Sequence, residues 1–135
     1  SRLPVIQLKV PGVTILKEAG LEVSVTPAKG YRKTPVQVGH YPSTAFIRRG
    51  KGRTPELIVR SRREGDRIQP TGMTGSVALK QLMINEKLPA NQRSGVPVFE
   101  SGGAIVWVSG YRVARSWSVP SKESPSWKVV VRKRG

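Results

Sequence analysis

Four arginines flank one short turn in the middle of this chain, and their side chains are well suited to binding anions. Arg60, Arg62, Arg63 and Arg67 lie on either side of the turn sequence Glu-Gly-Asp at residues 64–66. A guanidinium suits phosphate because its planar fork donates two parallel hydrogen bonds and remains charged near neutral pH. A tight turn would hold these forks at the end of a strand, where a nucleic-acid backbone can approach. The sequence therefore predicts phosphate contacts at this turn.

Residue types that perform catalysis are scarce in the rest of the chain. The sequence has no Cys, a single His (His40) and eight acidic residues. A disulfide framework and a thiolate metal site are thereby excluded. Ser101-Gly102-Gly103 lies in a predicted hairpin turn and continues into Ala-Ile rather than into a helix, so it is not interpreted as a nucleotide-binding loop. Asp66 is expected to cap the turn or to pair with Arg63 or Arg67. We expect no catalytic, cofactor-binding or metal-binding residue, and the sequence argues against a self-contained enzyme.

The charge of the chain indicates an anionic partner. Lys and Arg number 24 against eight Asp and Glu, which gives a net charge of +16 and a pI near 11.3. Such a balance is typical of nucleic-acid binding, although an acidic protein or an anionic membrane surface would also satisfy it. No apolar run approaches the length of a membrane span, so a cytoplasmic setting without a membrane is expected. Because the chain begins with Ser1 rather than Met, we expect a fragment of a longer protein.

One helix is predicted, at Gly75–Lys87, and it adds further basic residues. Leu79, Leu82 and Met83 follow the spacing of one buried helix face. Thr74 or Ser76 is expected to provide the N-cap oxygen, and Pro89 prevents continuation. Lys80 and Lys87 are seven positions apart and share one side of this helix. A solvated face is the ordinary interpretation of such a pair, and the nearby arginines make phosphate contact an equally good one.

The remaining pattern indicates strands and turns. Strands are predicted at residues 5–10, 13–16, 21–25, 45–47, 57–63, 96–99, 104–108 and 127–132, with weaker ones at 36–38 and 111–119. The alternation of Leu21, Val23 and Val25 with polar residues is typical of a half-buried strand. Residues 27–42 are expected to form a long loop, residues 48–55 a flexible basic loop and residues 132–134 a frayed basic tail. The chain is thus predicted to be mainly β.

Aromatic residues are too sparse to predict a protein that binds single strands by base stacking. Trp107 lies in an apolar strand and is expected in the core. Trp117 and Trp127 lie among polar residues, yet packing against a sheet is favoured for both. Contact with the backbone of an RNA duplex, recognised through its shape, fits these features better.

Several motifs in one order resemble the C-terminal domain of the tRNA(Ile)-lysidine synthetases. The resemblance extends from about residue 10 to Trp117. One position differs from the family pattern, since this chain has Thr71 where many relatives have Leu. The motifs that carry it are Val59–Arg67, Gln69–Met73, Lys80, Lys87–Pro89, Arg93, Val96–Pro97 and Ile105–Arg112.

The resemblance implies a fold and a function. The fold would be a β-sandwich of unusual topology with one short helix, similar to a module of the phenylalanyl-tRNA synthetase β subunit. The family's enzymes use ATP, with magnesium, to join lysine to the wobble cytidine of isoleucine tRNA with anticodon CAU. Their adenylating domain is absent here, so the fragment should be inactive alone. The C-terminal domain would hold the acceptor-stem region of the tRNA.

Residue types and resemblance together predict the organisation of the chain and its tRNA contacts. Residues 1–56 would be an N-terminal segment with a β-hairpin and the basic loop, and residues 57–135 a tRNA-binding module, unless the two form one continuous domain. Whether the chain forms a homodimer is left open. The alternative function is a basic β module that binds ribosomal RNA as a structural or assembly protein. The expected tRNA-binding residues are Arg60, Arg62, Arg63, Arg67, Lys80, Lys87, Arg93 and Arg112.

Overall fold

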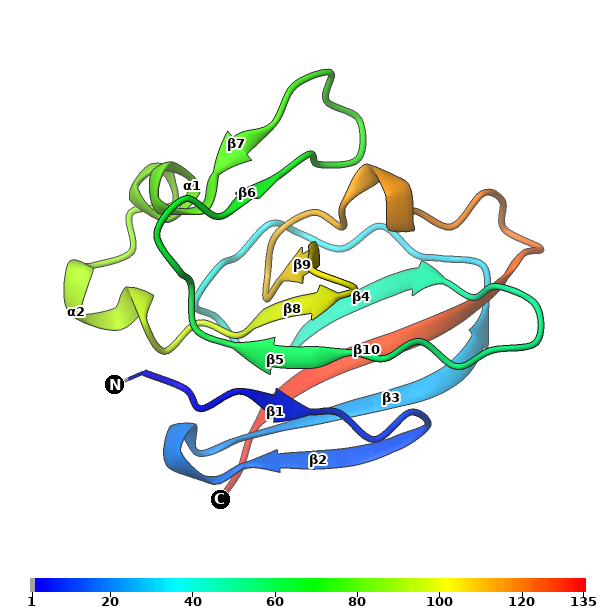
Figure 1. Cartoon of the computed structure of the whole chain (residues 1–135), viewed down its shortest axis with the longest axis horizontal. Coiled ribbons are helices and arrows are strands. Elements are labelled where there is room, and N and C mark those ends of the chain that lie inside the picture. Colours follow the sequence, from blue (N-terminus) through cyan, green and yellow to red (C-terminus); the bar gives the residue numbers. More distant parts are fainter. Residues whose placement is uncertain (1) are drawn as a thin grey trace.

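The computed structural model describes residues 2–135 and is built from two four-stranded antiparallel sheets with a small hairpin and short helices at one side (Figure 1). One sheet has the order β2 (Gly12–Leu16), β3 (Leu21–Lys29), β10 (Pro125–Lys133) and β4 (Ser43–Arg48). The other has the order β1 (Ile6–Gln7), β5 (Ile58–Arg60), β8 (Val98–Ser101) and β9 (Ala104–Val108). The hairpin pairs β6 (Arg67–Ile68) with β7 (Val77–Ala78), and the helices are α1 (Leu79–Asn85) and α2 (Ala90–Arg93), with 3-10 turns η1 (Lys17–Ala19) and η2 (Arg115–Trp117). The prediction of a mainly β fold with one short helix is confirmed.

The main core lies between the two sheets. Val25 and Val129 from one sheet and Val59 from the other belong to one buried cluster. In the same cluster the rings of Phe99 and Trp107 stack at 5.1 Å between centroids. Burial of large apolar side chains from both faces is the main stabilising contribution to such a sandwich. Trp107 is therefore a core residue, as its strand context predicts.

A second core fixes α1 on the outer face of the β8–β9 strands. Leu79, Leu82 and Met83 of α1 are buried together with Val98 and Val108. Neighbouring residues of a strand point to opposite faces, so Val98 packs on α1 while Phe99 packs in the main core. The helix is consequently held beside the β6–β7 hairpin, whose Ile68 joins the same cluster.

Both sheets contain strands from each half of the chain. Ile6 of β1 pairs with Val59 of β5. Along its whole length β10 pairs with β3, and it also pairs with β4 on its other side. The boundary at residue 56 therefore divides the sequence, whereas strands from its two sides pair with one another in both sheets.

Several predicted boundaries differ from the structure. The helix begins at Leu79 rather than Gly75, because Val77 and Ala78 pair with β6 instead. The N-cap is Ala78, without a side-chain capping bond, so the prediction of Thr74 or Ser76 was wrong. The strand predicted at 57–63 ends at Arg60, which leaves Arg62 and Arg63 outside it.

Three weaker predictions also need correction. Residues 36–38 form no strand. The loop predicted to begin at residue 27 begins later, because β3 continues to Lys29. Residues 111–119 contain the 3-10 turn η2 rather than a strand. The basic tail is not frayed, since Arg132 and Lys133 belong to β10 and the backbone N–H of Arg134 donates to Gly20. Within residues 2–135 we find no helix with the length and apolarity needed to cross a membrane.

Candidate nucleic-acid interface

The turn predicted to bind phosphate is organised around a buried arginine. Arg60 ends β5 with its side chain only 5% exposed. Its Nη1 and Nη2 donate to the two carboxylate oxygens of Asp66 at 2.8 and 3.1 Å, and its Nε donates to Glu100 at 2.8 Å. All three nitrogen atoms of this guanidinium therefore donate to carboxylates of the protein itself rather than to an external anion. The predicted phosphate contact of Arg60 does not fit this burial, and its position assigns it a structural role.

Asp66 completes this network and closes the turn. The backbone N–H of Arg63 donates to Asp66 Oδ2 at 2.7 Å. Burial would raise the pKa of the Asp66 carboxyl, but the hydrogen bonds from Arg60 and Arg63 and their positive charges hold it below its ordinary value. The hydrogen bond with Asp66 likewise raises the pKa of Arg60, against the effect of burial. The structural role predicted for Asp66 is confirmed, with Arg60 rather than Arg63 or Arg67 as its ion-pair partner.

Arg62 and Arg63 extend from the same turn toward solvent. Arg63 is exposed, and the Arg62 side chain, 23% exposed, lies 3.8 Å from the exposed Glu64 carboxylate. A third arginine, Arg2, donates from Nη2 to the carbonyl of Arg62 at 3.3 Å. The fold therefore brings Arg2 from the start of the chain to this turn, where sequence reasoning did not place it.

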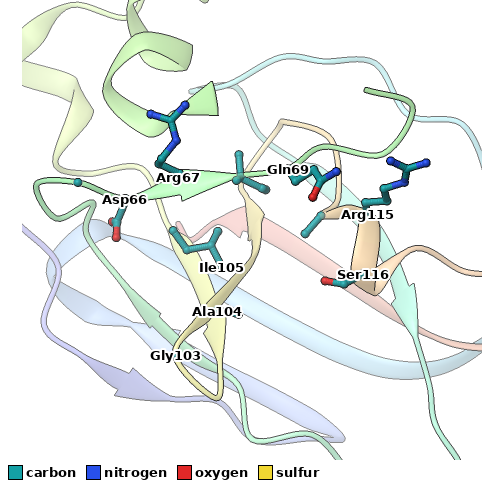
Figure 2. A pocket seen from close by; sticks show the side chains of 11 residues that line it. Asp66, Arg67, Gln69, Gly103, Ala104, Ile105, Arg115 and Ser116 are labelled. Atoms are coloured by element: carbon teal, nitrogen blue, oxygen red, sulfur yellow. The ribbon is translucent and has the colours of Figure 1, made fainter. Parts of the chain in front are cut away.

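Arg67 and Arg115 line a groove of about 540 Å³ next to the turn. The groove is also lined by Ile105 of β9 and by Gln69, which follows β6. Figure 2 shows the Arg67 and Arg115 side chains extending in the same direction, on either side of Gln69. A backbone hydrogen bond joins η2 to the segment after β6, since the N–H of Arg115 donates to the carbonyl of Gln69 at 2.8 Å.

Arg67 and Arg112 both lie close to the β6–β7 hairpin. Arg67 is exposed, and it donates from Nε and Nη2 to the hydroxyl and carbonyl of Ser76 at 2.9 and 3.1 Å. Ser76 thus positions Arg67 rather than capping the helix. Arg112 lies above the tip of the hairpin, with Nη1 4.0 Å from where a Cβ of Gly72 would stand. Arg67, Arg112 and Arg115 therefore form one exposed basic group around the hairpin and η2.

The helix adds its cations at two separate places. The backbone N–H of Leu79 donates to the carbonyl of Asp66 at 2.9 Å, which brings the start of α1, with the exposed Lys80, to the turn. Lys87 lies beyond the other end of α1 in a left-handed conformation, with φ of 60°. Arg93 is half-buried and donates from Nε to the carbonyl of Leu88 at 3.0 Å, which stabilises the bend between α1 and α2. The structure brings Lys80 to the turn and leaves Lys87 and Arg93 at a distance along the helix.

Arg115 is the basic residue of the groove that sequence reasoning missed. It fell in a predicted strand at 111–119, where its side chain had no evident neighbours. No local pattern marked it, because η2 begins at Arg115 and the preceding basic residue, Arg112, lies outside this turn. Within residues 2–135 no group of three His, Asp or Glu side chains is placed to bind a metal.

Comparison with known proteins identifies the family. Residues 57–131, which include the turn, the hairpin, α1 and η2, match the model of the TilS substrate C-terminal domain. The chain belongs to this family. Its sequence is 35% identical over 122 residues to a tRNA(Ile)-lysidine synthase of Caldanaerobacter subterraneus subsp. tengcongensis, covering 87% of this chain and 24% of that protein.

Two further matches agree with the family. A tRNA(Ile)-lysidine synthase of Dehalococcoides mccartyi is 47% identical over 64 residues, which cover 47% of this chain and 14% of that protein. A crystal structure of a TilS C-terminal domain superposes with a TM-score of 0.77 at 22% identity, and the match covers 98% of each chain. The family fold thus extends over nearly all of this chain, which spans a quarter or less of the length of these two curated relatives.

Proposed function

We propose that this chain is the tRNA-binding part of a tRNA(Ile)-lysidine synthase, the ATP-dependent ligase that attaches lysine to the wobble cytidine of isoleucine tRNA with anticodon CAU. The observation that carries the proposal is the family match over residues 57–131, which includes the basic turn, hairpin and helix. ATP, magnesium and lysine would act on the part of the enzyme outside this chain. The chain alone is then expected to be inactive, and the enzyme to work in the cytoplasm.

Contact with the acceptor-stem region of the tRNA would run through the exposed cations next to the turn. Arg63 lies in the turn, Arg67 in β6 and Lys80 in α1, and the Leu79–Asp66 backbone hydrogen bond joins the start of α1 to the turn. Arg112 and Arg115 continue this group on the other side of the hairpin. Long basic side chains on a rigid β scaffold suit the phosphates of a duplex, which is recognised through its shape. Arg62 would contribute from the edge, Lys87 and Arg93 at most peripherally, and Arg60 would only support the turn.

Electrostatic attraction should dominate the binding of tRNA because the net charge is +16. The affinity for isoleucine tRNA is expected to fall by roughly a decade or more for each few-fold rise in salt. Fluorescence anisotropy of labelled tRNA, titrated with the chain at several salt concentrations, measures this slope.

Two controls separate the alternatives. A methionine tRNA has the same CAU anticodon, so selectivity against it would indicate recognition outside the anticodon. A ribosomal RNA fragment of equal length tests the structural-protein alternative. Binding that does not depend on salt, no binding at low salt, or a preference for the ribosomal fragment would contradict the proposal.

A further inference from the structure

A second basic hollow lies far from the turn and the helix, at the other end of the sheets. It is formed by the loop between β4 and β5, which projects at one end of the molecule while α1 and α2 lie at the opposite end (Figure 1). Its volume is about 400 Å³, and its lining includes Arg49, Lys51 and Arg53 of the loop and Trp127 of β10. The lining holds these three cations and no carboxylate, whereas the first groove contains Asp66. Its electrostatic character therefore favours an anion.

Two buried N–H donors at this hollow have no acceptor within residues 2–135. They are Nε1 of Trp127, a residue only 4% exposed, and Nε of Arg49. By contrast, Trp107 Nε1 donates to the carbonyl of Tyr111 at 2.9 Å. A buried donor without a partner costs about 1–3 kcal/mol. The side chains that carry these donors are neighbours, since the Arg49 guanidinium carbon lies 5.3 Å from the centre of the Trp127 ring. A single acceptor group with several oxygens could satisfy both.

The loop that lines this hollow has the backbone freedom to admit such a group. A Cβ added at Gly50 or Gly52 would meet no atom within 4 Å, so these glycines do not serve close packing. Gly52 has φ of 81°, a conformation that L side chains rarely adopt. Because both nitrogen atoms are buried, an oxygen can reach them only if part of the lining moves, and residues 50–52 are the glycine-containing part of that lining.

We propose that this hollow binds a phosphate group of an RNA backbone. Lys51 and Arg53 neutralise the charge, while Arg49 Nε and Trp127 Nε1 donate to the phosphate oxygens. This inference rests on the proposed RNA-binding function and adds a second contact, at the end of the domain opposite α1. A phosphate fits better than a protein carboxylate, because three cations surround the two donors and phosphate offers more oxygens and more charge. Either one RNA would then extend across the molecule to both basic surfaces, or a second segment of RNA would bind at this hollow.

The indole N–H of Trp127 provides a direct test. In a 1H–15N NMR spectrum of the whole chain, Trp127→Phe assigns its indole resonance among the three tryptophans. Saturating tRNA is expected to shift this resonance with the same midpoint as anisotropy, while the resonance of Trp107, already bonded to Tyr111, stays in place. Inorganic phosphate and a short single-stranded oligoribonucleotide are titrated separately, to distinguish free phosphate from a phosphodiester.

Affinity measurements on charge-reversal variants give an independent readout. The double variant Lys51→Glu/Arg53→Glu should weaken tRNA binding about tenfold or more and lower the salt slope by about two. The matched double variant Lys9→Glu/Lys17→Glu changes two exposed lysines outside both basic surfaces and should change the slope by less than half as much. Trp127→Phe keeps the ring, removes the donor, and should weaken binding about threefold.

The outcomes separate this inference from the proposed function. If tRNA binds while the Trp127 resonance remains still, the hollow is not a phosphate site although the domain binds RNA. If tRNA does not bind the wild-type chain, the proposed function fails, and the phosphate and oligoribonucleotide titrations still decide the hollow. A shift with polyglutamate but not with RNA would show a site for protein carboxylates and overturn the inference.

Discussion

Arg60 and Arg63 are three positions apart on the same turn, yet their guanidinium groups have opposite surroundings. Arg60 is enclosed by Asp66 and Glu100, whereas Arg63 is exposed. A buried cation that is paired on both sides contributes by organising the turn, and it is not available to a ligand. Arg60 and Asp66 hold the backbone of the turn from which the exposed Arg63 extends, so we expect Arg63 to remain available to anions.

Replacing Arg60 should therefore affect stability rather than affinity alone. Arg60→Ala leaves two partly buried carboxylates without a partner and is expected to lower the free energy of unfolding by about 3–5 kcal/mol. Arg63→Ala, at an exposed position, should change it by only about 0.5 kcal/mol. Urea denaturation followed by circular dichroism measures both variants. Equal effects of the two substitutions would contradict the assigned structural role.

The same ion pair should make stability depend on pH in acid. The pKa of Asp66 is lowered in the folded chain from its ordinary value of 3.8. A carboxyl with a depressed folded-state pKa stabilises the fold above its unfolded-state value, and this contribution is lost as the pH falls through the folded-state pKa. The free energy of unfolding should consequently decrease below about pH 4. Urea titrations between pH 6 and pH 2 test this expectation.

Two variants identify the group responsible. Asp66→Asn is expected to be less stable near neutral pH and to lose part of the decrease in acid. Glu64→Gln removes a carboxylate that is 91% exposed and should retain the wild-type pH dependence. If both variants behave alike, the acid sensitivity has another origin.

At the scale of elements, the β6–β7 hairpin, α1 and η2 place the proposed RNA contacts. Arg67→Ala, Arg115→Ala and Lys80→Ala should each weaken tRNA binding by on the order of 1 kcal/mol and lower the salt slope by about one. Arg132→Ala at the end of β10 is the control and should do less, since it removes equal charge outside this surface. Anisotropy titrations at several salt concentrations compare the four. If Arg132→Ala matches the others, binding is diffuse rather than localised.

The elements that the sequence predicts well are those formed by residues close together in the chain. The alternation at Leu21–Val25, the Gly102-Gly103 turn and the spacing of Leu79, Leu82 and Met83 each depend on local periodicity, and the structure confirms all three. The similarity to a phenylalanyl-tRNA synthetase module stays a prediction.

Elements set by distant partners could not be read from local patterns. Pro27 suggested a loop, yet it lies in β3 opposite Trp127 of β10. β2 pairs with β3 only as far as Val25, so beyond that residue β3 is an edge strand, where a missing N–H is tolerated. Similarly, Arg60 became a core residue only because β5 pairs with β8 and so places Glu100 beside it.

At the scale of the whole molecule, the segment that matches the family model is smaller than the unit that buries a core. Residues 57–131 include all but the last two residues of β10, whose neighbours β3 and β4 both precede residue 57. Val129 and Val131 of β10 share their buried cluster with Val23 and Val25 of β3. Without the first 56 residues, β10 would lose both strands that pair with it, β3 and β4, and would be the only strand left of its sheet.

We therefore predict that residues 57–135 do not fold alone, although they contain the family match and most of the proposed RNA contacts. A strand with both edges and an apolar face exposed is unstable in water, because its backbone groups and buried side chains lose their partners. The two fragments 1–56 and 57–135, mixed in equal amounts, should recover the β-sheet circular dichroism and the dispersed NMR spectrum that neither shows separately. A circular permutant opened at the same peptide bond, with a flexible linker joining the original ends, keeps every strand and should fold. A cooperative unfolding transition for 57–135 alone would show instead that this module forms its own core, and that β3 and β4 only extend it.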